Sequence, residues 1–345
     1  MIRNRKVFYA IGQGGFYSEK IFFNGESKTI VYDCGSLNTN KLIKEIGQSG
    51  LGTIDYLVIS HFHRDHINGI EELKKNYKII NVVIPKIEPV DILFYLKNYP
   101  NKSDNEFRDL ILNPSNFFKQ ANNGQNSHII TVDIGEEQTE GLRLNQLPKR
   151  ITHSTNLPVL EYNNTPIWIL RFYIDKITFN KVELDNNEIR LINSIKTIND
   201  YDKHLKDLKK IYKKISNRDI NLTSMSMLSA PINNYWYYHK NNEVSLMNGD
   251  ILLNNEEKIS EFTNHYSDFN NNVFDFHIPH HGSHLNLKRP INEWNHKQGI
   301  INSGYENNYG HPSGIILRKF SDANINTKIL TEYDNNYSKI CFYEI

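Results

Sequence analysis

The sequence predicts a protein of the α/β class, and three observations support this prediction. Short apolar segments rich in β-branched residues alternate with segments whose apolar residues recur at helical spacing. Polar clusters follow the ends of several predicted strands, which is where α/β proteins place their functional groups. The chain has 345 residues, 39% of them hydrophobic, so it can bury a substantial core.

The first third of the chain has the clearest alternation of strands and helices. Residues 54–60 form an apolar, β-branched segment that leads directly into a cluster of histidines. A glycine-rich turn at residues 12–15 separates two earlier strands. The expected strands are residues 7–11, 20–23, 29–32, 54–60 and 79–84, and the expected helices are residues 41–46 and 67–73.

The pattern weakens between about residues 88 and 219. Residues 129–134 and 167–174 are expected to be strands, and residues 201–215 have the spacing of a Lys-rich helix. We interpret residues 88–219 as an insertion over the core of a single domain, residues 1–345, in preference to an independent domain.

Regular alternation returns in the last third of the chain. Strand segments here end in polar turns that contain Asp, His and Asn. The expected strands are residues 222–228, 244–247, 273–278, 299–302, 327–330 and 340–343, and the expected helices are residues 256–265 and about 313–320.

Net charge, cysteine count and hydropathy exclude some classes of protein. With 40 basic and 39 acidic residues the formal net charge is +1, so the whole chain has no general attraction to nucleic acid. Cys34 and Cys341 are the only cysteines, and two cysteines cannot build a disulfide framework. The chain contains no apolar run of signal-peptide or membrane-spanning length. We therefore expect a cytoplasmic protein without a membrane partner.

The strongest chemical signal follows the strand at residues 54–60. His61, His63, Asp65 and His66 are four ligand-type residues within six positions. A divalent metal needs imidazoles and carboxylates that converge to about 2.0–2.2 Å from one point. Alternation along the loop places His61 and His63 on one side, and Asp65 and His66 can face a second metal position. A chance cluster of four ligand-type residues directly after a strand is a poor alternative explanation.

A metal site in a loop also needs ligands from elsewhere in the chain. Asp250 follows a predicted strand and could bridge two metals, although an ordinary turn Asp is the simpler explanation when it is considered alone. His280 and His281 follow another strand, and one of them is expected to be a ligand while the other contacts substrate or a ligand. The chain has no Gly-x-Ser-x-Gly elbow and no phosphate-loop lysine to compete with this interpretation.

Two further residues are candidates for contact with substrate. His311 lies at the start of a predicted helix, where backbone N–H groups favour anions, so it could bind phosphate or act as a general acid. Ser283 follows the histidine pair and could contact the same group. The turn at residues 12–15 does not open a helix, so it does not indicate a dinucleotide site. The remaining histidines, among them His153, are expected to be ordinary surface or core residues.

These motifs resemble a known family. The segment His61–His66 matches the HxHxDH signature of hydrolases with the metallo-β-lactamase fold. More narrowly, the chain resembles the nuclease-like domain of the ComEC/Rec2 competence DNA-uptake proteins. The segments that carry this narrower resemblance, in the same order as in that subfamily, are Ile11–Gly15, Asp33–Gly35, Asn221 with Ser224, Gly249–Asp250, Pro279–Ser283 and Tyr309–Pro312.

The resemblance implies an αββα sandwich, in which two mixed sheets pack face to face with helices outside and the metals bind at one edge. Two departures from the pattern stand out. Gly15 replaces an Asp of the subfamily. Asn221 occupies the position where many members of the wider fold have a third histidine for the first metal, and His153 is a poor substitute for it.

The sequence thus predicts a hydrolase that uses two divalent metals, zinc or manganese, to cleave a phosphodiester such as DNA or RNA. His61 and His63 would hold one metal, and Asp65, His66 and His280 the other. Asp250 would bridge the two metals, and Asp65 would also orient the attacking water. The alternatives are a hydrolase of a small ester, lactone or phosphorylated lipid, and a metal-binding sensor or scaffold in defence or signalling.

Overall fold

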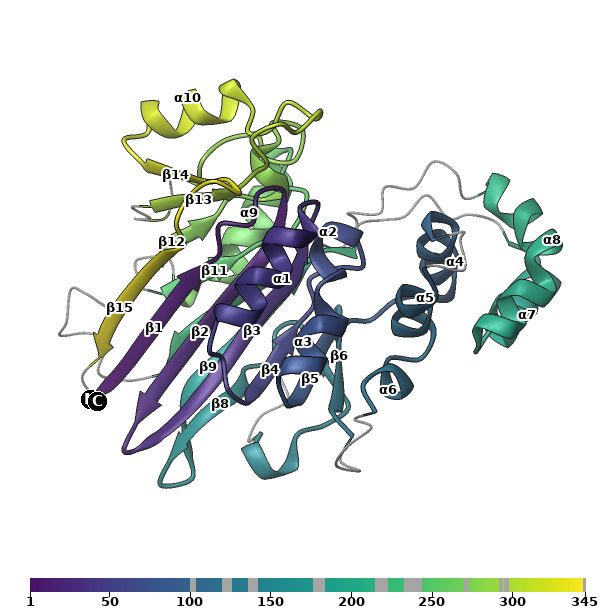
Figure 1. Ribbon diagram of the computed structural model, residues 1–345, viewed down its shortest axis with the longest axis horizontal. Helices are drawn as coiled ribbons and strands as arrows, with labels where there is room; N and C mark the ends of the chain where they lie inside the picture. The colour runs from purple at the N-terminus through teal and green to yellow at the C-terminus, as the bar shows by residue number, and fades with distance from the viewer. Residues whose placement is uncertain are drawn as a thin grey trace.

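A computed structural model describes most of the chain, and two mixed sheets form its centre (Figure 1). The remaining residues are not described below. The described residues are 1–99, 104–119, 126–135, 142–175, 184–214, 223–232, 244–269, 273–291, 294 and 298–343.

The first sheet has eight strands and contains the strand that leads to the histidine cluster. Its outer strands on one side pair antiparallel, and its inner strands from β3 onward pair parallel. In spatial order the strands are β15 (Tyr337–Tyr343), β1 (Ile2–Phe8), β2 (Gly14–Phe23), β3 (Glu26–Ser36), β4 (Ile54–Val58), β5 (Ile79–Pro85), β6 (His128–Asp133) and β7 (Arg150–Thr152).

The second sheet has seven strands and contains the strands that lead to Asp250 and to the histidine pair. Parallel pairing joins the four strands at one side, and antiparallel pairing joins the rest. In spatial order the strands are β14 (Asn326–Leu330), β13 (Gln298–Asn302), β12 (Val273–His277), β11 (Val244–Met247), β10 (Met225–Pro231), β9 (Thr165–Ile174) and β8 (Leu157–Tyr162).

Alternation along the strands produces four layers. In β3, Ile30 and Tyr32 face the space between the sheets, whereas Val31 faces the helices outside the first sheet. Helices α1 (Thr39–Gln48) and α3 (Ile70–Asn76) cover this outer face, and α9 (Glu256–His265) and α10 (Gly314–Asp322) cover the outer face of the second sheet. The predicted αββα sandwich with two mixed sheets is therefore confirmed.

Residues 88–219 do more than cover the core. They supply β6 and β7 to the edge of the first sheet and β8 and β9 to the edge of the second. The interpretation as an insertion over the core is therefore too simple, because both sheets need these strands. The same residues form α4 (Pro89–Asn98), α5 (Asn105–Leu112), α6 (Pro114–Phe117), α7 (Asn186–Ser194) and α8 (Ile198–Lys214), which project to one side in Figure 1.

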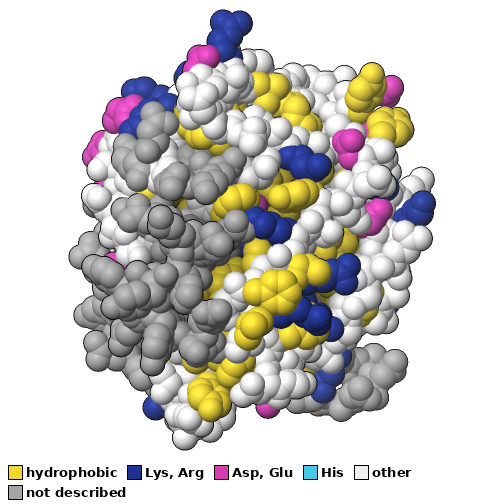
Figure 2. Space-filling model, turned by 90° about the vertical axis from the view of Figure 1, so that its left-hand side faces the viewer, with side chains coloured by type: hydrophobic (Ala, Val, Ile, Leu, Met, Phe, Trp, Pro, Cys, Tyr) yellow, Lys and Arg dark blue, Asp and Glu magenta, His cyan; other side chains and the backbone are white. Residues whose placement is uncertain are grey.

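The outer face at the β15–β1–β2 end of the first sheet carries mixed side chains. Figure 2 shows apolar and basic side chains interleaved on this side of the molecule. Arg3 lies between its cross-strand neighbours Phe22 and Phe342, with its guanidinium 4.2 Å from the Phe22 ring centroid. Among the described residues, no helix is both long enough and apolar enough to cross a membrane.

Candidate metal centre

The histidine cluster begins directly after β4, at the edge where the carboxyl ends of the parallel strands meet. Residues 59–63 form a loop, and α2 (Arg64–Ile67) follows it. The backbone carbonyl of Ser60 accepts a hydrogen bond of 2.9 Å from the N–H of Met225, which ties this loop to the second sheet. The loop is thus held by both sheets.

One group of candidate ligands consists of His61, His63 and Asp250, whose ligand atoms all lie within 4.8 Å of one another. Nε2 of His61 and Nδ1 of His63 lie 3.6 and 3.8 Å from Oδ2 of Asp250. His280 joins the same side, with its Nε2 also 3.8 Å from Oδ2 of Asp250. Three imidazoles therefore surround one carboxylate oxygen.

The second group consists of Asp65, His66 and His281, again with ligand atoms within 4.8 Å. Nε2 of His281 lies 3.2 Å from Oδ2 of Asp65, and Nε2 of His66 lies 3.3 Å from Oδ1 of Asp250. Asp250 therefore presents one oxygen to each group. Asp250 thus lies between the two groups of candidate ligands.

The histidine pair differs from expectation in one respect. We expected His280 with Asp65 and His66, but the structure places His281 there and His280 beside the first group. Both histidines have positive φ angles, 48° and 53°, a conformation that is costly for residues other than glycine. Backbone hydrogen bonds to Gly249 and from Ser283 hold this turn, and they point the two rings to opposite sides of Asp250.

The ligand imidazoles are oriented by a second set of partners. Oδ2 of Asp33 lies 2.8 Å from Nδ1 of His66, and it also accepts a 2.6 Å hydrogen bond from the Ser60 hydroxyl. Ser60 Oγ in turn lies 2.9 Å from Nδ1 of His61. These contacts engage both Nδ1 atoms and leave both Nε2 atoms facing Asp250, as is common for metal-binding histidines.

The same pattern recurs on the other side of the centre. The carbonyl oxygen of Asn302, at the end of β13, lies 2.9 Å from Nδ1 of His281. Sequence analysis noted Asp33 as part of a motif and gave it no role, and it did not identify Asn302. Asp33 lies within β3, where the pairing with β2 is irregular, and has a φ angle of 54°, which is an indication of a functional constraint that the sequence alone does not reveal.

The ionisable groups of this centre lie close together, and burial and neighbouring charges shift their pKa values. Burial lowers the pKa of His61 to about 3. Burial would also lower the pKa of His66, but the carboxylates of Asp250 and Asp33 raise it well above its usual value. Burial would raise the pKa of Asp250, whereas the surrounding histidines, His280 first, hold it well below its usual value. Asp250 therefore stays ionised and His61 stays neutral, as a carboxylate and an imidazole must be to bind a metal.

The donor atoms fit divalent metal ions. Nε2 of His61, Nε2 of His66 and Oδ1 of Asp250 are buried and have no hydrogen-bond partner among the described residues. A buried polar atom without a partner costs about 1–3 kcal/mol, and metal coordination would remove this cost. Imidazole and carboxylate ligands suit zinc and manganese alike.

The two predicted substrate-contact residues have different positions. The His311 ring lies 5.5 Å from the His280 ring between centroids, and its Nδ1 is buried without a partner among the described residues. Burial lowers the pKa of His311 to about 4. Ser283 is buried and accepts a 3.3 Å hydrogen bond from the N–H of Leu285, so the geometry gives it a role within the loop.

His153 lies apart from the two groups of candidate ligands. His153 stacks on Tyr173, with 5.7 Å between ring centroids, and its ring lies 4.9 Å from that of His265. It therefore does not replace the missing third histidine of the first group. Asn221, which was aligned with that histidine, lies outside the described residues. His280 is the imidazole that the structure places there.

Fold and site together define a protein with two adjoining sets of metal ligands at one edge of an αββα sandwich. Residues 20–164 match the model of the metallo-beta-lactamase superfamily. This part of the chain is therefore similar to the metallo-β-lactamase superfamily. The matched residues include the HxHxDH ligands, while Asp250 and the histidine pair lie beyond them.

Individual relatives match a shorter part of the chain. A hydroxyacylglutathione hydrolase of Photobacterium profundum is 37% identical over 70 residues, which are 20% of this chain and 27% of that protein. Hydroxyacylglutathione hydrolase 2 of Vibrio vulnificus is 34% identical over 70 residues, with the same coverage of 20% and 27%. The match thus spans about a quarter of these relatives' length.

A solved structure of a long form RNase Z from yeast is also similar. The identity is 14% and the TM-score 0.34, and the match covers 87% of this chain and 37% of that one.

Proposed function

We propose that this protein is a metal-dependent hydrolase that cleaves a phosphodiester. His61, His63 and His280 would hold one divalent ion, with Asp250 shared between this ion and the next. The proposal of two ions is supported by Asp250, which offers Oδ2 to the first group and Oδ1 to the second.

The second ion would be held by Asp65, His66 and His281 together with Asp250. Two adjacent divalent ions lower the pKa of water and neutralise negative charge on a substrate. The protein's own contribution is to fix the ligands. Asp33 and Ser60 hold the Nδ1 atoms of the HxHxDH imidazoles, and Asp65 can accept a hydrogen bond from an attacking water.

The observation that carries the choice of a phosphodiester is the position of His311. Its buried Nδ1 lacks a partner among the described residues, and its ring is close to the rings of both His280 and His281, at 5.5 and 6.5 Å. As a neutral imidazole it can donate a hydrogen bond to a leaving alkoxide. A thiolate or an enol leaving group has much less need of such a donor.

A second candidate is a hydrolase of a small ester or thioester. The similarity to hydroxyacylglutathione hydrolases favours it. The same ligand set would serve this reaction, so the substrate has to be decided by assay. A sensor or scaffold without activity is disfavoured, because binding a ligand without reaction does not require so many convergent metal ligands.

The test is a substrate panel on protein loaded with zinc or manganese, comparing His311→Ala with the unmodified chain. The panel contains single-stranded DNA, bis-4-nitrophenyl phosphate, a diester with a poor alkoxide leaving group, and a hydroxyacylglutathione. We expect hydrolysis of the diesters. His311→Ala should slow the alkoxide diester by about 10²- to 10⁴-fold and the nitrophenyl diester only slightly, at unchanged metal content.

Three results would change this assignment. Equal losses on both diesters would make His311 a positioning residue, and loss of metal would make it a ligand. Turnover of the hydroxyacylglutathione without diester cleavage would refute the proposal and establish the thioester alternative.

A further inference from the structure

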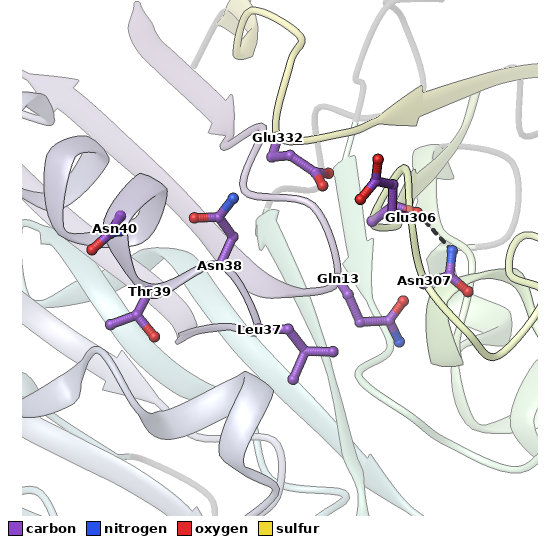
Figure 3. Close-up of a pocket in the computed structure, with 9 residues that line it drawn as sticks. Gln13, Leu37, Asn38, Thr39, Asn40, Glu306, Asn307 and Glu332 are labelled. Atoms are coloured by element: carbon purple, nitrogen blue, oxygen red, sulfur yellow. Dashed lines mark hydrogen bonds between the residues drawn. The ribbon is translucent and has the colours of Figure 1, made fainter.

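A polar pocket beside the metal centre carries an inference about the substrate. The pocket has a volume of about 450 Å³ and opens between the turn after β1, the start of α1 and the loops after β13 and β14 (Figure 3). We propose that it binds an ammonium group of the substrate, a proposal that rests on the proposed hydrolase function. Its lining includes Gln13, Glu306 and Glu332, together with asparagines and Leu37.

The first support is a buried acceptor without a partner. Gln13 lines the pocket and is only 6% exposed. Its Oε1 has no hydrogen-bond partner among the described residues. A buried amide oxygen in this state favours a ligand that donates a hydrogen bond, because the donor would remove the cost of desolvation.

The second support is the charge of the lining. Glu306 and Glu332 contribute two carboxylates, and none of the described lining residues is a lysine or an arginine. Glu332 is fixed in place, because its Oε2 accepts a 3.0 Å hydrogen bond from the N–H of Tyr305. Such a lining repels phosphate and attracts a cation that carries N–H donors.

The third support is the connection between the pocket and the metal centre. Asn307 lines the pocket and holds the backbone of His311 from both sides, with 2.6 Å to its carbonyl oxygen and 3.0 Å to its N–H. On the opposite wall, Gln13 is followed by Gly14, which has a φ angle of 151°, and a Cβ there would lie 2.7 Å from the carbonyl oxygen of Asp65. The pocket wall and the candidate ligands are therefore connected through two loops, and the proposal places one small substrate across both.

The test uses pairs of 4-nitrophenyl phosphodiesters whose second ester group is an aminoalkyl chain or an alkyl chain of equal length. A series from two to six carbons covers different reaches. For at least one length, kcat/KM of the amino diester should exceed that of its alkyl partner by about five-fold or more, through a lower KM. In the double variant Glu306→Gln/Glu332→Gln this ratio should fall to about one.

The matched control is Glu257→Gln/Glu261→Gln on α9, which removes the same charge from exposed positions outside the pocket. It should keep the ratio of the unmodified protein. A ratio near one at every length in the unmodified protein, or an equal ratio in the pocket variant, would overturn the inference.

Failure of the hydrolase proposal can be separated from failure of this inference. If no diester is cleaved, calorimetric titration of the same pairs still reports binding, and it can be repeated in His61→Ala, which is expected to lack the first metal. Tighter binding of the amino compound that disappears in Glu306→Gln/Glu332→Gln supports the pocket without any turnover. Equal binding of both compounds refutes it.

Discussion

The loops that carry the metal ligands and the helices of residues 88–219 differ in how they are held. His61, His66 and His281 are buried, and each has a second partner behind its ring. Helix α8 instead turns a row of lysines to solvent, with only isolated surface ion pairs such as that between Lys210 and Asp207. These three candidate ligands are thus fixed on two sides, whereas the lysines of α8 face solvent.

One contact between the two regions lies at Phe62. The Tyr99 hydroxyl, directly after α4, donates a 2.6 Å hydrogen bond to the carbonyl of Phe62 in the ligand loop, and the Phe62 ring packs on Tyr95 at 5.4 Å. The contact reaches the backbone of the loop and not a ligand side chain. The helices can therefore position the loop without taking part in the reaction.

The largest effect is expected from the carboxylate shared by both ligand groups. Asp250→Ala removes the oxygen that faces each metal, so bound metal should fall to near zero and hydrolysis by about a thousand-fold or more. His61→Ala should act in the same direction. Mass spectrometry measures metal content, and far-UV circular dichroism verifies that the variants remain folded. Asp322→Ala, at an exposed position at the end of α10, is the control. Full metal occupancy in Asp250→Ala would remove this residue from the site.

The ligands in the HxHxDH loop could be predicted because their residue types and spacing are local in sequence. The choice between His280 and His281 could not, because it depends on a turn with two positive φ angles that only the hydrogen bonds to neighbouring loops define. Asp33 was missed as a functional residue because its partners, Ser60 and His66, lie about 30 positions away in the chain.

The same distinction applies to the fold. Elements that depend on residues nearby in sequence could be predicted, and elements that depend on distant residues could not. Strand β1 begins at Ile2, whereas the expected strand began at residue 7. The first part of the strand was missed because Asn4 and Lys6 face inward at positions where apolar residues are normally expected. Lys6 is completely buried and pairs with Asp275 of the other sheet at 3.4 Å. An inward lysine is consistent with a strand only when its distant carboxylate is known. Strands β7 and β8 were not expected from the sequence, because each lies at the edge of its sheet and edge strands carry weak periodicity.

An intermediate effect is expected from the group behind His66. Asp33→Asn keeps the shape of the side chain but removes the carboxylate that receives the Nδ1 proton of His66, so metal affinity should fall about 10- to 100-fold. A chromogenic chelator in competition measures this affinity. Because Asp33 acts through His66, excess metal should restore most of kcat. A loss of kcat that metal does not restore, with unchanged affinity, would contradict the positioning role.

The smallest effect is expected on the helical side of the comparison. Lys206 and Lys209 are exposed on α8, and the charge of a single solvated lysine is largely screened beyond about 8 Å at physiological salt. Lys206→Gln/Lys209→Gln should therefore leave metal content unchanged and stability within about 0.5 kcal/mol. The rate of nucleic-acid cleavage and its dependence on salt should also stay the same.

Arg64→Gln serves as a comparison variant, because Arg64 lies inside the ligand segment. Its guanidinium is 5.0 Å from the Phe107 ring centroid. If the lysine variant instead cleaved DNA more slowly with a shallower salt dependence, the helix would contact the phosphate backbone. Substrate would then extend from the metal centre across the helices, and the distinction between a chemical region and a tolerant one would no longer hold.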